Sequence, residues 1–118
     1  ELDALLRQSD IVSMHLTLGD ETRGFLSAER IAAMKKSAIF VNTARAALVD
    51  EAAMLAALTS GQIAHAALDV YHSEPLSPDH ALVRMENVTL SAHAAFRTLE
   101  ASMTLLRRAI DIVKSLAH

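Results

Sequence analysis

The 118-residue sequence contains no cysteine, no tryptophan, three glycines, two prolines and only 3% aromatic residues. Without cysteine it forms neither a disulfide framework nor a thiolate zinc site, which agrees with a reducing, cytoplasmic setting. The glycines, Gly19, Gly24 and Gly61, cannot be placed in a G-x-G-x-x-G turn, the motif that presents a helix N-terminus to a pyrophosphate. If the protein has such a phosphate-binding segment, we expect it upstream of Glu1.

Charge and hydropathy exclude two classes of partner. The net charge is −3, and the only adjacent basic pairs are Lys35-Lys36 and Arg107-Arg108, so no basic stripe is available for nucleic acid. No apolar run approaches the roughly 20 residues that span a bilayer, so no membrane partner is expected. Hydrophobic residues nevertheless make up 52% of the chain, with a mean hydropathy of +0.25. This richness predicts one domain whose strands are covered on both faces.

Four short apolar runs alternate with helical patterns along the chain. They cover residues 11–16, 38–41, 63–70 and 88–91. Such alternation predicts parallel β-α-β units, and therefore an α/β fold with a parallel sheet of about four strands and flanking helices.

Capping residues set the expected helix boundaries. Ser27 is a predicted N-cap for a helix over 28–34, and Asp50 for the next helix, which Gly61 would end in the left-handed conformation. A further short helix is expected over residues 20–25, because Asp and Thr there can act as caps.

The last third of the chain combines a long polar connection with a long amphipathic helix. Residues 71–87 contain both prolines, and connections of this length are usually functional or mobile. The helix that follows, of about 20 residues, is too apolar to lie bare on solvent. The breadth of its apolar stripe predicts contact with its own sheet and with an absent domain or partner subunit. The stripe comprises Leu99, Met103, Leu106, Ile110 and Val113, widened by Leu105, Ile112 and Leu116.

Arginine, glutamate and histidine side chains follow three successive strand-like runs. Arg45 comes after the second run, Glu74 after the third and His93 after the fourth. In a parallel sheet these positions share the carboxyl edge, where ligands of α/β proteins bind. Alone, Arg45 would more often be a solvated loop residue, but the three together predict a site. The other histidines show no metal-ligand spacing, so no metal site is expected, and these are His15, His65, His72, His80 and His118.

Several short segments have a recognisable order and spacing. They are residues 10–16 (DIVSMHL), 21–24 (ETRG), 41–45 (VNTAR), 48–51 (LVDE), 66–70 (AALDV) and 74–75 (EP). Together they resemble the D-isomer-specific 2-hydroxyacid dehydrogenases, which include phosphoglycerate dehydrogenase and the glyoxylate and hydroxypyruvate reductases. The resemblance implies a partial Rossmann-like sheet. Residues 1–96 would form the C-terminal half of a dinucleotide-binding domain without its Gly-rich half, and residues 97–118 the long helix leading toward a substrate domain.

The resemblance also implies roles for individual residues. Arg45 would bind the substrate carboxylate and carbonyl, His93 would be the acid/base, and Glu74 its carboxylate partner. Asp69 would lie near the nicotinamide amide, although an aspartate at a strand end can also simply bond a nearby backbone amide. The implied cofactor is NAD or NADP, and its implied contacts are Leu16, Thr43, Ala44, Arg45, Asp69, His93 and Ala95.

These residue types suit the implied reaction on physical grounds. When a hydride reaches a keto carbon, charge grows on the oxygen, and a protonated imidazole within hydrogen-bond reach can deliver a proton there. A neighbouring carboxylate favours the charged imidazolium. The planar guanidinium of arginine can hold a carboxylate through two parallel hydrogen bonds, which lysine cannot reproduce.

The sequence therefore predicts part of an NAD(P)-dependent oxidoreductase that interconverts D-2-hydroxy acids and 2-keto acids, homodimeric when intact and inactive as this piece alone. A non-catalytic dinucleotide-sensing or interaction protein on the same scaffold is the alternative, and the three site residues do not exclude it. A third possibility is an assembly piece or degraded remnant whose exposed helix drives association.

Overall fold

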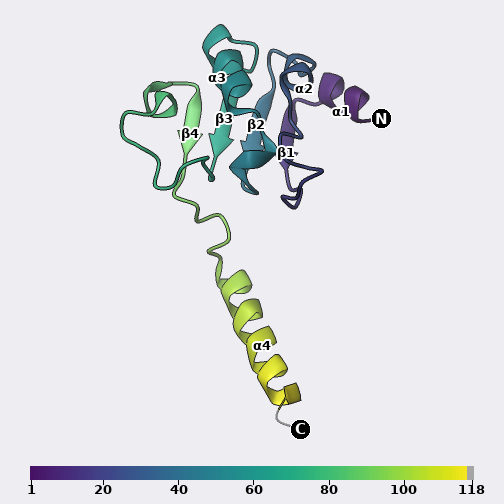
Figure 1. The fold of residues 1–118 in the computed structure, drawn as a ribbon, viewed down its shortest axis with the longest axis vertical. Coiled ribbons are helices and arrows are strands. Elements are labelled where there is room, and N and C mark those ends of the chain that lie inside the picture. The colour runs from purple at the N-terminus through teal and green to yellow at the C-terminus, as the bar shows by residue number, and fades with distance from the viewer. Residues whose placement is uncertain (117–118) are drawn as a thin grey trace.

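The computed structural model describes residues 1–116, so His118 lies outside the described part (Figure 1). The chain forms helices and strands in alternation, with two short 3-10 helices, η1 and η2. In order, the elements are α1 (Leu2–Gln8), β1 (Ile11–Met14), α2 (Ala28–Ala32), β2 (Ile39–Asn42), η1 (Ala46–Leu48), α3 (Glu51–Ser60), β3 (His65–Leu68), η2 (Ala81–Arg84), β4 (Val88–Leu90) and α4 (Leu99–Leu116).

The four strands form one parallel sheet in the order β1-β2-β3-β4, as the alternating pattern predicted. In register, Val12 lies beside Phe40, Phe40 beside Ala66, and Ala66 beside Val88. Since neighbouring strands are parallel and nearly level, their carboxyl ends meet at one edge. Every loop that follows a strand therefore begins at that edge.

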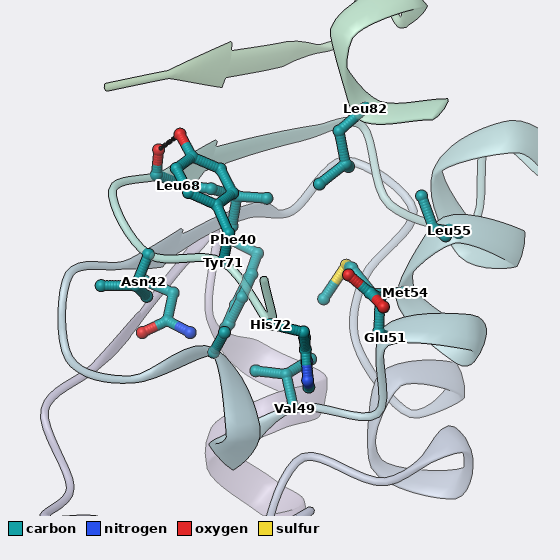
Figure 2. Close-up of a pocket in the computed structure, with 12 residues that line it drawn as sticks. Phe40, Asn42, Val49, Glu51, Met54, Leu55, Leu68, Tyr71, His72 and Leu82 are labelled. Carbon is teal, nitrogen blue, oxygen red and sulfur yellow. Dashed lines mark hydrogen bonds between the residues drawn. The ribbon is translucent and has the colours of Figure 1, made fainter. Parts of the chain in front are cut away.

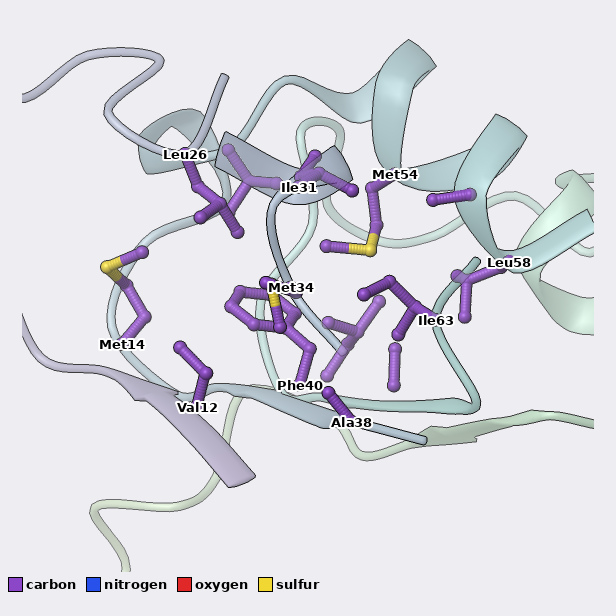
Figure 3. Packing of buried hydrophobic residues seen from close by; sticks show 14 of the residues in the cluster. Val12, Met14, Leu26, Ile31, Met34, Ala38, Phe40, Met54, Leu58 and Ile63 are labelled. Atoms are coloured by element: carbon purple, nitrogen blue, oxygen red, sulfur yellow. The ribbon is translucent and has the colours of Figure 1, made fainter. Parts of the chain in front are cut away.

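Helices α2 and α3 cover one face of the sheet and enclose the core (Figure 3). Phe40 at the centre of β2 is fully buried, whereas Ile11 and Ile39 on the opposite face are 61% and 38% exposed. The expectation that the strands are covered on both faces is therefore wrong within residues 1–116. The reason is the two-residue period of a strand, which sends alternate side chains to the face that α2 and α3 leave open.

The predicted helix caps are confirmed by their geometry. The Ser27 side chain accepts a hydrogen bond from the Arg30 amide, and the Asp50 side chain accepts one from Ala53 at 3.0 Å. Gly61 ends α3 with φ of 72°, a conformation in which only glycine avoids a steric penalty. Both helices thus begin after their predicted caps, and α3 ends at its predicted glycine, whereas α2 ends at Ala32 and not at the predicted residue 34.

Residues 20–24 form turns, so the short helix expected over residues 20–25 is wrong. The Thr22 hydroxyl donates to the Thr17 carbonyl at 2.7 Å and accepts from the Gly19 amide at 2.8 Å. These bonds offer the backbone an alternative to a helix, as threonine side chains commonly do in turns. The predicted loop over 71–87 is likewise interrupted, because η2 forms within it.

Helix α4 spans 18 residues, close to the predicted length, but it stands away from the sheet (Figure 1). Every residue from 99 to 116 is exposed. The predicted contact between the apolar stripe and its own sheet is therefore wrong, because residues 91–98 lead the chain off the sheet before α4 begins. The predicted contact with another domain or subunit stays a prediction. Nowhere in residues 1–116 is a helix long and apolar enough to cross a membrane.

Candidate active site

Arg45 lies in a tight turn just beyond β2, and the last residue of that strand shapes the turn. The Asn42 side chain, which is 2% exposed, accepts a hydrogen bond from the Ala44 amide and donates to the Arg45 carbonyl, both at 3.0 Å. The Arg45 side chain is exposed, and its Nη1 donates to the Ala44 carbonyl at 2.6 Å. Asn42 thus fixes the backbone at the carboxyl edge, while the guanidinium is presented to solvent.

Glu74 and His93 are brought together across 19 positions of sequence. His93 Nδ1 lies 2.7 Å from Glu74 Oε2, and Glu74 Oε1 accepts the Tyr71 amide at 3.0 Å. The bond from His93, and next the bond from the Tyr71 backbone, hold the pKa of Glu74 below its ordinary value of 4.5. An ionised carboxylate only accepts hydrogen bonds, so His93 carries a proton on Nδ1. Its second ring nitrogen, Nε2, is left for another partner.

The loop that carries His93 is bonded to the buried carboxylate of Asp69, which is 3% exposed. Oδ1 accepts from the Ser91 hydroxyl at 2.6 Å and from the Ala94 amide at 2.9 Å, and Oδ2 accepts from the Ala95 amide at 2.9 Å. Burial alone raises the pKa of this carboxyl, but the hydrogen bonds outweigh burial and the pKa lies below its ordinary value. Asp69 is therefore a charged group held inside the protein by three donors.

Tyr71 ties the ends of β3 and β4 together. Its hydroxyl lies 2.6 Å from the Ser91 carbonyl and 3.0 Å from the Leu68 carbonyl, the second of which is drawn in Figure 2. Because its backbone amide also bonds Glu74, the same residue supports both sides of the Glu74–His93 pair. Burial raises the pKa of the Tyr71 hydroxyl, which keeps it a neutral hydrogen-bond donor.

Two hollows lie near the carboxyl edge. The larger has a volume of about 450 Å³, and Glu74 and His93 are among its lining residues, with Leu76 and Leu90 as apolar walls. The smaller, about 30 Å³, lies between α3 and strands β2 and β3 and is mostly apolar (Figure 2). That volume is room for about one water molecule, so the larger hollow is the candidate site.

The structure joins some of the predicted site residues directly and not others. Within residues 1–116, no hydrogen bond or ion pair links Arg45 to Glu74 or His93. Leu16 and Thr43 follow β1 and β2 and are exposed, while Ala44 is half-buried. The arrangement is a hydrogen-bonded acid/base pair at the end of β3 and β4, with an exposed guanidinium at the end of β2.

Asn42, Tyr71 and Ser91 were given no role by the sequence analysis, yet all three hold the site together. The position of Asn42 at the end of an apolar run, where its side chain would be buried beside the turn, was a usable signal. The bonds of Tyr71 and Ser91 depend on distances between loops, which no pattern in the sequence reports.

A parallel sheet with polar residues gathered at its carboxyl edge is the arrangement in which α/β proteins bind nucleotide cofactors. The comparison with known families agrees. The chain belongs to the D-isomer specific 2-hydroxyacid dehydrogenase family, because residues 1–95 match the profile described as the NAD binding domain of that family.

Individual relatives give the same result. A glyoxylate reductase of Aeropyrum pernix is 47% identical over 117 residues, covering 99% of this chain and 35% of the relative. A putative D-3-phosphoglycerate dehydrogenase from Ralstonia solanacearum superposes with a TM-score of 0.84 at 39% identity, over 98% of this chain and 35% of that one. A D-isomer specific 2-hydroxyacid dehydrogenase from Xanthobacter autotrophicus, solved with NADPH and MES, gives 0.75 at 48% identity, over 78% and 30%. The chain thus spans about a third of the length of these relatives.

Proposed function

We propose that the intact protein is an NAD(P)-dependent oxidoreductase that transfers a hydride between nicotinamide and a D-2-hydroxy acid or its 2-keto acid. The observation that carries the proposal is the 2.7 Å bond between His93 Nδ1 and Glu74 Oε2 at the carboxyl edge of the sheet. It leaves Nε2 able to exchange a proton with a substrate oxygen. Membership of the dehydrogenase family supports the reaction class.

Each of three side chains has a distinct proposed role. Protonated His93 donates from Nε2 to the carbonyl oxygen as negative charge develops during reduction, and takes that proton back in the reverse direction. Glu74 accepts from Nδ1 throughout, so it orients the ring and favours its charged form. Arg45 binds the substrate carboxylate through its guanidinium. His93 is therefore the catalytic group and Glu74 its positioning group, and Arg45 sets which end of the substrate reaches His93.

The residues at the edge fit the nicotinamide end of a dinucleotide better than its phosphates. The exposed side chain of Leu16 and the hollow of about 450 Å³ beside His93 offer apolar and polar surface at the strand ends. No Gly-rich turn that could hold the pyrophosphate occurs in the sequence. When bound, the nicotinamide supplies or accepts the hydride. The residues proposed to contact NAD or NADP are Leu16, Thr43, Ala44, Arg45, Asp69, His93 and Ala95.

Other parts of the intact protein are proposed to complete the site. Residues 1–96 are proposed to be the C-terminal half of the cofactor domain and residues 97–118 the helix that leads to the substrate domain. The exposed stripe of α4 is proposed to pack on other parts of the intact homodimer. Because the 118-residue chain is proposed to hold only part of the cofactor domain and has no Gly-rich turn, it is expected to be inactive alone.

The test is a cofactor-oxidation assay on the intact protein. NADH and NADPH are each mixed with glyoxylate, hydroxypyruvate and a panel of larger 2-keto acids, and the reverse reaction is run with matched D- and L-2-hydroxy acids. Turnover confined to 2-keto acids and D-2-hydroxy acids supports the proposal. Tight binding of NADH without turnover on any of them favours the dinucleotide-sensing alternative instead.

A Glu74→Gln substitution in the intact protein should lower kcat by about ten- to a hundredfold. This loss is smaller than the one expected on removing His93, the proposed acid, because general acid–base groups contribute about 10²–10⁴ to the rate. Glutamine still accepts from His93 but carries no charge to favour the imidazolium. In the wild-type protein the Glu74 carboxylate is ionised above its lowered pKa and is lost as a partner when the pH falls through that value. The acid limb of the pH profile of kcat/KM should therefore change in the variant.

Glu86→Gln is the matched control, because this carboxylate lies on the 71–87 connection and is not among the partners of His93. It should leave both kcat and the pH profile unchanged. An unchanged profile in Glu74→Gln would contradict the proposed role of Glu74.

A further inference from the structure

The buried carboxylate of Asp69 accepts hydrogen bonds from the chain segment that carries His93. It follows β3 directly, is 3% exposed, and its three donors all come from the segment 91–95 that contains His93. One donor, the Ser91 hydroxyl, precedes His93 by two residues, and the other two are the Ala94 and Ala95 amides, which directly follow His93. The carboxylate therefore bonds the chain on both sides of His93, and within residues 1–116 no hydrogen bond joins it to the His93 ring.

His93 itself has a backbone conformation that demands such support. Its φ is 51°, in the left-handed region that non-glycine residues seldom adopt, and it is the one non-glycine residue with positive φ in the described part of the chain. Because the conformation is unfavourable by itself, the surrounding contacts must hold it in place. The bonds from Ala94 and Ala95 to one carboxylate are contacts of this kind, since they fix the direction of the chain directly after His93.

We propose that Asp69 is a positioning residue for His93. By accepting hydrogen bonds from the Ala94 and Ala95 amides, Asp69 holds the left-handed backbone of His93, so that the imidazole bonds Glu74 and Nε2 faces the substrate. This rests on the proposed function, because it assigns His93 the proton transfer. Asp69 then acts through the histidine loop, in addition to any contact with a cofactor. Glu74 thus orients the ring of His93, and Asp69 orients the backbone that carries the ring.

The geometry favours this role over a purely direct contact with nicotinamide. Three of the roughly four acceptor positions of a carboxylate are occupied by donors of the same chain. With 3% of the residue exposed, little of it is left for a ligand. Breaking these bonds to reach a cofactor would leave the buried carboxylate of Asp69 short of donors, which is costly.

The experiment compares Asp69→Asn with Asp50→Asn in the intact protein, using two readouts. Asp50 is a matched control, because its side chain also accepts a backbone amide, that of Ala53, but at the start of α3 and outside the site. The readouts are site-resolved hydrogen exchange and steady-state kinetics with NADH and the best 2-keto acid. Asparagine keeps the size of Asp69 but turns an NH₂ group toward donors.

In Asp69→Asn we expect the Ala94 and Ala95 amides to exchange at least about tenfold faster, with core amides of β2 and β3 changed much less. kcat should fall by at least about tenfold while KM for the keto acid changes by less than about threefold. Ser91→Ala, which removes one donor and keeps the carboxylate, should shift both readouts the same way by a smaller factor. Asp50→Asn should change neither.

Three results would overturn the proposal. The first is unchanged exchange at Ala94 and Ala95 with a raised KM for NADH, which assigns Asp69 to the cofactor. The second is faster exchange throughout the sheet in Asp69→Asn, and the third is the same loss of kcat in Asp50→Asn; either of these reduces the role to general stability. If the wild-type protein shows no turnover, the proposed function fails, whereas the exchange result still decides whether Asp69 holds the loop.

Discussion

Replacing Arg45 by alanine in the intact protein is expected to lower kcat/KM for 2-keto acids by about a hundred- to ten-thousandfold. A guanidinium that holds a carboxylate makes two charge-assisted hydrogen bonds, each worth about 1.5–3 kcal/mol, and both are lost. At about 1.4 kcal/mol for each factor of ten, the sum gives that range. The fold should survive, because the side chain is exposed and its bond reaches only the neighbouring Ala44 carbonyl. Steady-state kinetics and thermal unfolding of the same preparation measure both effects.

Two further variants complete this test, one at position 45 that separates charge from geometry and one elsewhere as a control. Arg45→Lys keeps the positive charge but loses the planar fork, so it should recover only a small part of the activity. Arg84→Ala is the surface control, since Arg84 pairs with Asp79 at 3.3 Å with both side chains largely exposed. It should behave as the wild type. Near-normal turnover in Arg45→Ala would remove the proposed substrate-binding role.

The positions of the three proposed site residues could be predicted from sequence for a specific reason. Arg45, Glu74 and His93 each follow an apolar run, and parallel strands bring such positions to one edge whatever the loops between them do. Two facts therefore sufficed, namely the alternation of strands with helices and the residue types at the strand ends. The caps at Ser27 and Asp50 were predictable for a similar reason, because a cap bonds an amide only three residues away.

What could not be predicted depends on contacts between segments distant in sequence. Asp69 reads from sequence as a polar residue at a strand end, and only the fold shows its carboxylate bonded to amides 25 and 26 positions later. The apolar stripe of α4 indicates burial but not the surface that covers it. In the turn at Thr22, two hydrogen bonds within five residues override a pattern that reads as a short helix.

His93→Asn in the intact protein should lower kcat by about 10²–10⁴, the usual contribution of a general acid–base group. Asparagine is chosen because it tolerates positive φ better than most residues, so the backbone at 51° can be kept while the titrating ring is removed. The affinity for NADH, measured by fluorescence titration, should change little by comparison. His65→Asn is the control, because that ring bonds Thr89 on the neighbouring strand at 2.9 Å and has no proposed part in the reaction.

Combining His93→Asn with Glu74→Gln tests whether the two residues act as a unit. If Glu74 acts only through the imidazole, its substitution has nothing left to impair once the ring is gone, and the double variant should be no slower than His93→Asn alone. Independent contributions would instead multiply the two losses. Multiplied losses would therefore contradict the role proposed for the 2.7 Å bond between Glu74 and His93, even if each single variant behaved as expected.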